Sequence, residues 1–495
     1  MKQLVRGSSV LTAVSIGEMV MRFIRTKCIA LFLGPAGTGF LAQLMIFFEI
    51  LRVFGDLGSR RGVIKQIAEQ RQAGRNGSRY GEVIKTSYFL AIVASGVTGL
   101  IVTLFSPAIS RSLYGTSSHY LFIVFTALLL PIASISTVTA SIVKGNLDYA
   151  PFAKYTVASY LVVMAVTPFL IYFMHYWGAV LVQGLFFIFP LVSYLIFNSR
   201  SKFISFSKKI NIAALKEQFS YGSIQVYQDS LLGFSKVLIA AWIVKGLGLS
   251  AMGMYQVVIT FSTVYMAVPI QAMSGYTLPL IAAAENIKEI TRIINESLRF
   301  LMFLLVPVII AVMVLSEIFI RFFFSVEFLA AAVPLQIQLL GTLFLLVAFP
   351  FTVALQARGR LKAIFITATV TSLLYVGLGW FLFDLKQLAG VAIAFAAANF
   401  AGLAIQYYLV RRHFEFHLFP KNQRLVTATA LWAGAAWWAG SMTWEFRLLA
   451  LALVIPWFLF GSKKHEREFL KKKFYALKGL KISFTEKRLL KPSRV

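Results

Sequence analysis

Four charged residues interrupt an apolar segment near the start of the chain, where residues 10–33 read VLTAVSIGEMVMRFIRTKCIALFL. The segment is long enough to cross a bilayer as a helix. Each charge near the membrane centre costs roughly 2.5–3.5 kcal/mol. Glu18, Arg22 and Arg25 follow at i, i+4 and i+7 and share one helical face. We expect this face to line a protected, cationic, water-accessible cavity, whereas Lys27 points elsewhere.

The composition is that of a multi-pass membrane protein. Of 495 residues, 59% are hydrophobic, and the mean hydropathy is +0.77, whereas soluble domains hold roughly 45–50% apolar residues. Backbone groups in lipid must bond internally, which predicts an all-α polytopic fold. The net charge of +29 is assigned to cytoplasmic loops and not to nucleic-acid binding. The only cysteine, Cys28, excludes an intramolecular disulfide, and residues 10–33 exceed the length of a cleavable signal peptide.

Twelve apolar runs of spanning length are predicted, and two weaker runs add a C-terminal hairpin that would bring the total to fourteen. They cover residues 10–33, 38–56, 84–109, 120–143, 152–174, 177–198, 219–244, 251–275, 298–321, 333–357, 363–383, 388–410, 425–442 and 446–461. The domains that we assign are an N-terminal six-helix lobe (1–198), a basic cytoplasmic linker (199–218), a C-terminal six-helix lobe (219–410), an extra transmembrane hairpin (411–461) and a basic cytoplasmic tail (462–495).

Basic residues alternate between successive loops. Most of the 48 Lys and Arg residues lie in the termini and in the loops that we place inside. The loops of the opposite side hold only Arg111, Lys245, Arg321, Lys386 and Arg447. Because cytoplasmic loops collect positive charge, we expect both termini to be cytoplasmic. The outer loops are short and leave no room for an extracytoplasmic domain.

The two six-helix lobes are predicted to be parallel repeats around a central cavity. A shift of 214 residues aligns the halves and pairs Gly34 with Gly248, Gly39 with Gly253 and Arg22 with Lys236. One cation from each half would then face a common cleft.

Further polar stripes follow on the helices next to this cleft. They comprise Glu49, Arg52 and Asp56 in the second run, Gln225, Asp229 and Lys236 in the seventh, and Gln256, Thr260 and Thr263 in the eighth. Surplus guanidinium groups suit an anion, above all a diphosphate, which arginine binds in bidentate fashion. Asp56 lies near a cytoplasmic end, where we expect it to be solvated. The structural alternative is that Glu18–Arg22 and Glu49–Arg52 are intrahelical ion pairs.

No nucleotide-binding motif is present, so no cofactor is predicted and an ATP-driven pump is disfavoured. An integral-membrane enzyme such as a glycan polymerase is also disfavoured, because it needs a larger outer loop.

Residues 31–71, LFLGPAGTGFLAQLMIFFEILRVFGDLGSRRGVIKQIAEQR, resemble the N-terminal signature of Wzx-type flippases for O-antigen and lipid III. These belong to the multidrug/oligosaccharidyl-lipid/polysaccharide exporter superfamily. Residues 253–284, GMYQVVITFSTVYMAVPIQAMSGYTLPLIAAA, look like the matching region of the second half. The resemblance implies two lobes around a V-shaped cavity that opens alternately to cytoplasm and periplasm. It also implies a bacterial inner-membrane protein and not an enzyme.

The implied function is to flip an undecaprenyl-diphosphate-linked oligosaccharide, an O-antigen or related repeat unit. In related lipid II flippases, arginines of the first helices of each lobe are thought to hold the diphosphate. The residues of this chain that match that role are Arg22, Arg25, Arg52 and Lys236, the last standing where an arginine is expected. Candidates for coupling or charge tuning are Glu18, Glu49 and Asp229, and candidate glycan contacts are Gln225, Tyr227, Gln256 and Thr260.

Two further expectations concern partners. By family, a polysaccharide polymerase and a chain-length regulator are expected neighbours, and the basic tail is expected to lie on anionic inner-leaflet lipid or to be merely solvated. The alternative function is a cation-coupled small-molecule or drug antiporter of the same superfamily, which predicts an acid-dominated cavity.

Overall fold

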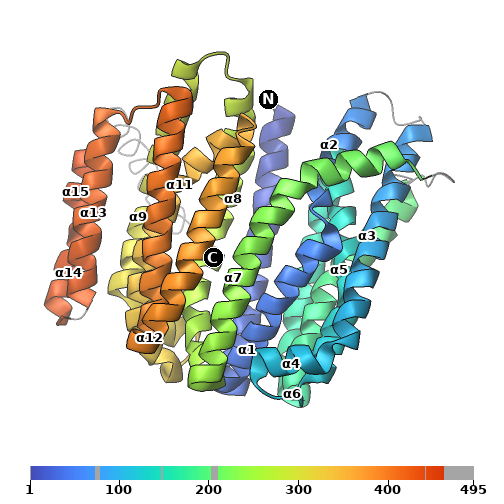
Figure 1. The fold of residues 1–495 in the computed structure, drawn as a ribbon, viewed down its shortest axis with the longest axis horizontal. Coiled ribbons are helices and arrows are strands. Elements are labelled where there is room, and N and C mark those ends of the chain that lie inside the picture. The colour runs from blue at the N-terminus through green and yellow to red at the C-terminus, as the bar shows by residue number, and fades with distance from the viewer. Residues whose placement is uncertain (1, 73–77, 147–148, 202–209, 441, 462–495) are drawn as a thin grey trace, which may run out of the picture.

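Helices make up the regular structure of the described residues (Figure 1). The structure, a computed structural model, describes residues 2–72, 78–146, 149–201, 210–440 and 442–461. The elements are α1 (Lys2–Asp56), α2 (Ser59–Gln72), α3 (Ser78–Leu104), α4 (Ser106–Tyr114), α5 (Tyr120–Asn146), α6 (Tyr149–Ser201), α7 (Ile212–Ile259), the π-helix η1 (Thr260–Val264), α8 (Tyr265–Ala283), α9 (Ile287–Val314), α10 (Ser316–Phe323), the 3-10 helix η2 (Val326–Ala331), α11 (Ala332–Ala357), α12 (Leu361–Phe414), α13 (Pro420–Gly440), α14 (Trp444–Ala452) and α15 (Val454–Gly461).

Eight helices in this part of the chain are long and apolar enough to span a membrane, which confirms an all-α multi-pass membrane protein. A straight α1 would be about 80 Å long at ~1.5 Å per residue, far longer than the ~30 Å hydrocarbon core. Instead α1 reverses direction at Gly34 (φ 63°, ψ −167°). A single non-helical residue also interrupts α6 at His175, α7 at Gly248 and α12 at Gln387. These reversals lie at the lower end in Figure 1, here called the turn end, and the opposite end is the loop end.

Two predicted spans end earlier than expected, because the chain changes direction within an apolar run. The run 84–109 is divided at Phe105 (φ −97°, ψ 10°) between α3 and α4. The run 298–321 is divided in the same way at Leu315 (φ −103°, ψ 25°) between α9 and α10. Such a bend does not change the hydropathy of the run, so the hydropathy pattern does not predict it. The two bends, like Gly34 and Gly248, recur at nearly the same spacing in the two halves of the chain.

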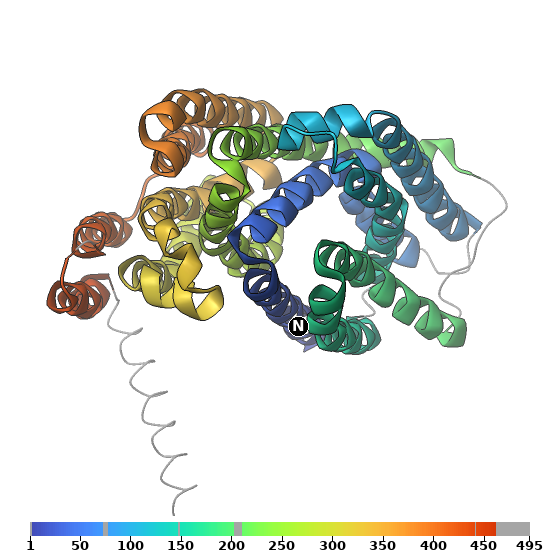
Figure 2. The same ribbon diagram turned by 90° about the horizontal axis from the view of Figure 1, so that it is seen from below.

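The contact between α1 and α7 is reciprocal. A Cβ atom on Gly39 would lie 1.8 Å from the carbonyl oxygen of Leu249, and one on Gly253 would lie 2.0 Å from that of Pro35. Gly39 and Gly253 are 214 residues apart, as are Pro35 and Leu249. The helices therefore meet backbone to backbone, an approach that small residues permit. Figure 2 shows α1 (blue) at the centre of the molecule, between α5–α6 and the elements that follow α7.

The weak C-terminal runs form α13, α14 and α15, which lie against α9 at one edge of the molecule (Figure 1). The Trp457 ring packs on Phe303 of α9 with the centroids 5.3 Å apart. Its indole Nε1 donates to Thr429 Oγ1 at 2.8 Å, and that of Trp432 donates to the carbonyl of Ala450 at 2.6 Å. The indole N–H groups are thus satisfied inside the packed hairpin, as burial requires.

Candidate functional site

The charged face of the first α1 segment contains one ion pair. Arg22 Nη2 lies 2.9 Å from Glu18 Oε1, and Arg22 Nε donates to the same oxygen at 3.0 Å. The side chains of Arg22 and Glu18 remain 42% and 36% exposed, so the pair stays accessible. This bridge, which the structural alternative predicted, is confirmed. Arg25 is held differently, because its Nη1 donates to the amide oxygen of Gln183 on α6 at 2.5 Å.

Arg52, in the second α1 segment, has no acid within ion-pair distance among the described residues. Its Nη2 donates to Thr137 Oγ1 of α5 at 3.1 Å, and its guanidinium lies 5.1 Å from the ring centroid of Phe187 on α6. The predicted Glu49–Arg52 bridge is wrong, since these partners hold the guanidinium toward α5 and α6 while the Glu49 side chain is exposed.

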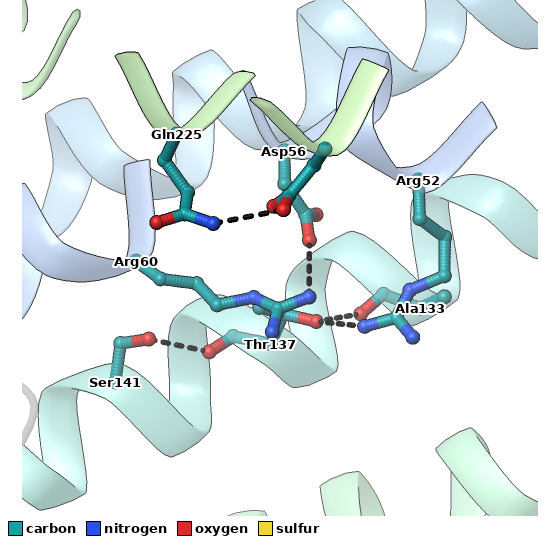
Figure 3. A network of polar contacts seen from close by, with 8 residues as sticks. Arg52, Asp56, Arg60, Ala133, Thr137, Ser141 and Gln225 are labelled. Atoms are coloured by element: carbon teal, nitrogen blue, oxygen red, sulfur yellow. Dashed lines mark hydrogen bonds and ion pairs between the residues drawn. The ribbon is translucent and has the colours of Figure 1, made fainter. Parts of the chain in front are cut away.

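Asp56 also departs from the sequence-based expectation. It is buried at 4% exposure, and the prediction of a solvated carboxylate is wrong. Arg60 Nη2 lies 3.3 Å from Asp56 Oδ2, whereas the buried Oδ1 of Asp56 has no hydrogen-bond partner in the part of the chain that the structure describes. Figure 3 shows the Arg60 guanidinium reaching into the space between Asp56 and Thr137, near Arg52. Arg60 follows the end of the apolar run 38–56, where the hydropathy pattern predicts a loop and gives no sign of this contact.

The arginine group is defined here as Arg22, Arg25 and Arg52. All three side chains contact the same part of α6, because Arg25 bonds Gln183 and the other two guanidinium groups lie over phenylalanine rings of that helix. Only Arg22 has a carboxylate in direct contact among the described residues. The site therefore keeps a surplus of positive charge and has guanidinium N–H groups for an anion.

The polar residues of α7 form a separate set. Gln225 Nε2 donates to Asp229 Oδ1 at 2.8 Å, a contact drawn as a dashed line in Figure 3. Lys236, the repeat equivalent of Arg22, is half-buried and has no hydrogen bond or ion pair within the described ranges. The two halves thus bring different chemistry to equivalent positions.

The remaining candidate glycan contacts are dispersed. Tyr227 bonds Thr369 of α12 at 2.7 Å between the hydroxyl oxygens, and its ring stacks on Phe365 with the centroids 4.3 Å apart. Gln256 Nε2 lies 3.3 Å from Oγ1 of Thr260, which is buried and donates back to the Gln256 carbonyl. Tyr227 therefore lies between α7 and α12, whereas Gln256 and Thr260 bond within their own helical segment.

Lys27 points away from the charged face of α1 and contacts the C-terminal end of α10. Its Nζ donates to the carbonyl oxygens of Phe322, at 2.8 Å, and Phe324. The Phe23 ring packs edge-on against Phe323 with the centroids 4.7 Å apart. A cation on the free carbonyls of a helix C-terminus is favourable, so this contact joins distant parts of the chain at the turn end.

A family model described as "Polysaccharide biosynthesis protein" matches residues 28–333, which is more than half of the chain. The chain belongs to this family. The lipid III flippase of Escherichia coli (strain K12) is 24% identical over 350 residues, which are 68% of this chain and 81% of that protein. The resemblance noted from residues 31–71 and 253–284 is thus confirmed.

Solved structures share the fold of this chain. The lipid II flippase MurJ in an inward closed conformation has a TM-score of 0.68 at 17% identity, with 92% of this chain and 99% of MurJ covered. An inward-facing multidrug resistance MATE transporter of the MOP superfamily has a TM-score of 0.65 at 15% identity, with 82% and 98% covered. The relatives and the family indicate a transporter and not an enzyme.

At the loop end of the molecule, polar contacts join α2 to the start of α7. Glu217 accepts from Gln66 Nε2 at 2.9 Å and from Lys65 Nζ at 3.1 Å. A Cβ on Gly58 would lie 2.5 Å from the carbonyl oxygen of Gly222, so the backbones touch as well. The hydrogen bond from Gln66 and then that from Lys65 lower the pKa of the Glu217 carboxyl.

We expect Glu217→Gln to lower stability near neutral pH and not in acid. A group whose folded pKa is lowered stabilises the fold above its unfolded pKa of 4.5, and this contribution disappears as the pH falls through the folded pKa. Because the pair is partly exposed, the effect at pH 7 is at most about 1 kcal/mol. Thermal unfolding in detergent across this pH range measures it, with Glu296→Gln, at an exposed glutamate of α9, as control. An equal penalty at all pH values would contradict the assignment.

Proposed function

We propose that this protein is a flippase that moves an undecaprenyl-diphosphate-linked oligosaccharide from the cytoplasmic to the periplasmic leaflet. The observation that carries the proposal is the arginine group, in which Arg25 and Arg52 are held by uncharged partners and keep their charge for a ligand. A diphosphate is the anion that several guanidinium groups bind best. The curated relative, named a lipid III flippase, supports a lipid-linked glycan.

We assign twelve membrane passes in two lobes, 1–198 and 219–410, joined by the linker 199–218 and followed by the hairpin 411–461. The reversals in α1, α6, α7 and α12 support this count, because each divides a helix too long for one pass. The loop end, which carries basic residues such as Arg60 and Lys65, is assigned to the cytoplasm by the positive-inside rule. Both termini then lie inside.

Transport follows alternating access in this proposal. The contacts that would have to part on the periplasmic side are Lys27 with α10 and the crossing of Gly39 and Gly253. Those on the cytoplasmic side are Glu217 with Lys65 and the approach of Gly58 to Gly222. Each set joins α1 or α2 to elements of the second half, so each can act as a gate between the two lobes.

The arginine group, with Lys236 on the opposite lobe, would neutralise the diphosphate. The membrane potential supplies about 2.3 kcal/mol per charge per 100 mV. A headgroup with two negative charges that crosses the whole field uncompensated is therefore driven outward by roughly 4–5 kcal/mol per 100 mV. Glu18, Glu49 and Asp229 are assigned to coupling or charge tuning. Glu18 is the best placed of the three for this role, because it forms an ion pair with Arg22 of the arginine group.

The glycan is assigned as an O-antigen or related repeat unit, contacted by the polar side chains Gln225, Tyr227, Gln256 and Thr260. A polymerase and a chain-length regulator are the expected partners in the inner membrane. The basic tail, 462–495, proposed to bind anionic inner-leaflet lipid, lies outside the described residues.

A drug antiporter is the second candidate, since a multidrug transporter shares the fold. A cavity for cationic drugs would be dominated by acids. The arginine group argues against that, because only one of its members pairs with a carboxylate in the part of the chain that the structure describes.

Native mass spectrometry of the full chain, stripped gently of detergent, tests the proposal. We expect a retained undecaprenyl-diphosphate glycan, whose mass would give the sugar composition. If only phospholipid is retained and added undecaprenyl diphosphate does not bind, the flippase assignment is wrong. Resistance profiling of an overexpressing strain then tests the antiporter.

A further inference from the structure

One turn of α6 contacts every member of the arginine group. Gln183, Phe186 and Phe187 are spaced i, i+3 and i+4 and so share one helical face. Gln183 accepts from Arg25 Nη1 at 2.5 Å. The Arg22 guanidinium lies 5.3 Å from the Phe186 ring centroid, and that of Arg52 lies 5.1 Å from the Phe187 centroid. Three arginines from two segments of α1 thus converge on a single turn of another helix.

Aromatic residues outside this turn pack against its two phenylalanine side chains. Tyr160 stacks on Phe186 with centroids 5.3 Å apart and planes within 6°. Phe48 packs on Phe187 at 5.7 Å. Gln183 and Phe187 are 8% and 7% exposed. A side chain packed in this way is confined to one rotamer, so it can set the position of its partner.

The partners on this turn are also electrically neutral. Three guanidinium groups gathered around one helical turn carry like charges and repel one another. Carboxylates would relieve the repulsion but remove the charge. An amide oxygen and two aromatic faces attract the guanidinium groups and leave their charge intact. Arg25 Nε and Arg52 Nε are buried and have no hydrogen-bond acceptor among the described residues. Such donors are costly unless an acceptor such as a phosphoryl oxygen reaches them.

We propose that Gln183, Phe186 and Phe187 are positioning residues that hold Arg22, Arg25 and Arg52 together as a preorganised anion site, in which only Arg22 is paired with a carboxylate among the described residues. This inference rests on the proposed function in naming the diphosphate of a polyprenyl lipid as the ligand. Preorganisation raises affinity because the cost of bringing the like charges together is met during folding and not on binding.

The test uses two substitutions that preserve packing. Phe187→Leu keeps an apolar side chain and removes the aromatic face, and Gln183→Glu keeps the acceptor oxygen and adds a charge beside Arg25. We expect each to raise the Kd for undecaprenyl diphosphate in nanodiscs by about tenfold or more, as loss of a desolvated cation–π contact or of one cation implies. Phe187→Trp, which restores an aromatic face, should return the Kd to within about threefold of wild type.

Phe189→Leu is the matched control, because Phe189 lies on the same helix and packs in the apolar cluster around Val163 and Val182. Thermal unfolding of each variant separates a lost site from a lost fold. Inorganic diphosphate is the second probe, since it presents the same anion without the lipid. Variants that bind both probes as tightly as Phe189→Leu would overturn the inference while leaving the flippase assignment intact.

Different results would refute the positioning role and the flippase assignment. If the wild-type protein binds inorganic diphosphate and loses it on Phe187→Leu, but does not bind the polyprenyl lipid, the positioning role holds and the flippase assignment is wrong. If the wild-type protein binds neither probe, the inference fails together with the flippase assignment.

Discussion

Replacing Arg22 and Arg25 together by alanine is expected to reduce translocation of the lipid-linked oligosaccharide by at least about a hundredfold. Two hydrogen-bonded charges are each worth about 1.5–3 kcal/mol, and a factor of ten corresponds to about 1.4 kcal/mol. The Glu18 carboxylate, paired with Arg22 in the wild-type protein, would also be left without its partner. The measurement is the initial rate of flipping in proteoliposomes.

Two further variants serve as comparisons for the double alanine variant. Arg111→Ala removes an exposed cation on α4 outside the arginine group and should leave the rate unchanged. Arg25→Lys keeps the charge but loses the planar fork, so a rate between those of wild type and alanine would show that guanidinium geometry matters. A double alanine variant that flips at the wild-type rate would refute the diphosphate clamp and leave the arginines with a structural role.

Gly39→Ala is expected to cost about 3 kcal/mol or more of stability. The new Cβ would meet the Leu249 carbonyl oxygen at 1.8 Å. The carbonyl oxygen belongs to the backbone and the position of a Cβ is fixed by its own backbone, so no side-chain rotation relieves the clash, and α1 and α7 must separate. Gly253→Ala should behave alike, since its Cβ would meet the Pro35 carbonyl oxygen at 2.0 Å. Thermal unfolding in detergent measures the loss.

Gly377→Ala on α12 is the control for helix propensity. A Cβ there meets nothing within 4 Å, so alanine should be neutral or should stabilise the helix by up to about 1 kcal/mol. Equal stability of the Gly39 and Gly377 variants would show that the crossing of α1 and α7 adjusts freely, contrary to the reciprocal contact.

The helical architecture follows from the apolar runs, because lipid requires each long run to satisfy its own backbone. The turn at Gly34 also follows, since Gly34 precedes Pro35 and glycine readily adopts φ 63°. The bends at Phe105 and Leu315 could not be predicted from the sequence, because both lie within unbroken apolar runs.

The site was predicted only where both partners lie on one helix. The i, i+4 spacing of Glu18 and Arg22 predicts their ion pair. Glu49 and Arg52 are also spaced for an intrahelical ion pair but do not form it, since Thr137 and Phe187 from other helices hold the Arg52 guanidinium. Phenylalanines in an apolar run give no signal of a polar role. The one cue on α6 was Gln183, a lone amide among apolar neighbours.

The reciprocal crossing of Gly39 and Gly253 has the form of an isologous interface, in which the same patch of two subunits meets across a two-fold axis. A single chain with such an interface is the expected product of gene duplication and fusion of an ancestral homodimer. We infer that the backbone has kept the dimer's symmetry while the side chains have diverged, with Arg22 in one copy and Lys236 in the other. The proposed lipid-linked oligosaccharide has two unlike ends, and such divergence would let the two halves distinguish them where a symmetric dimer could not.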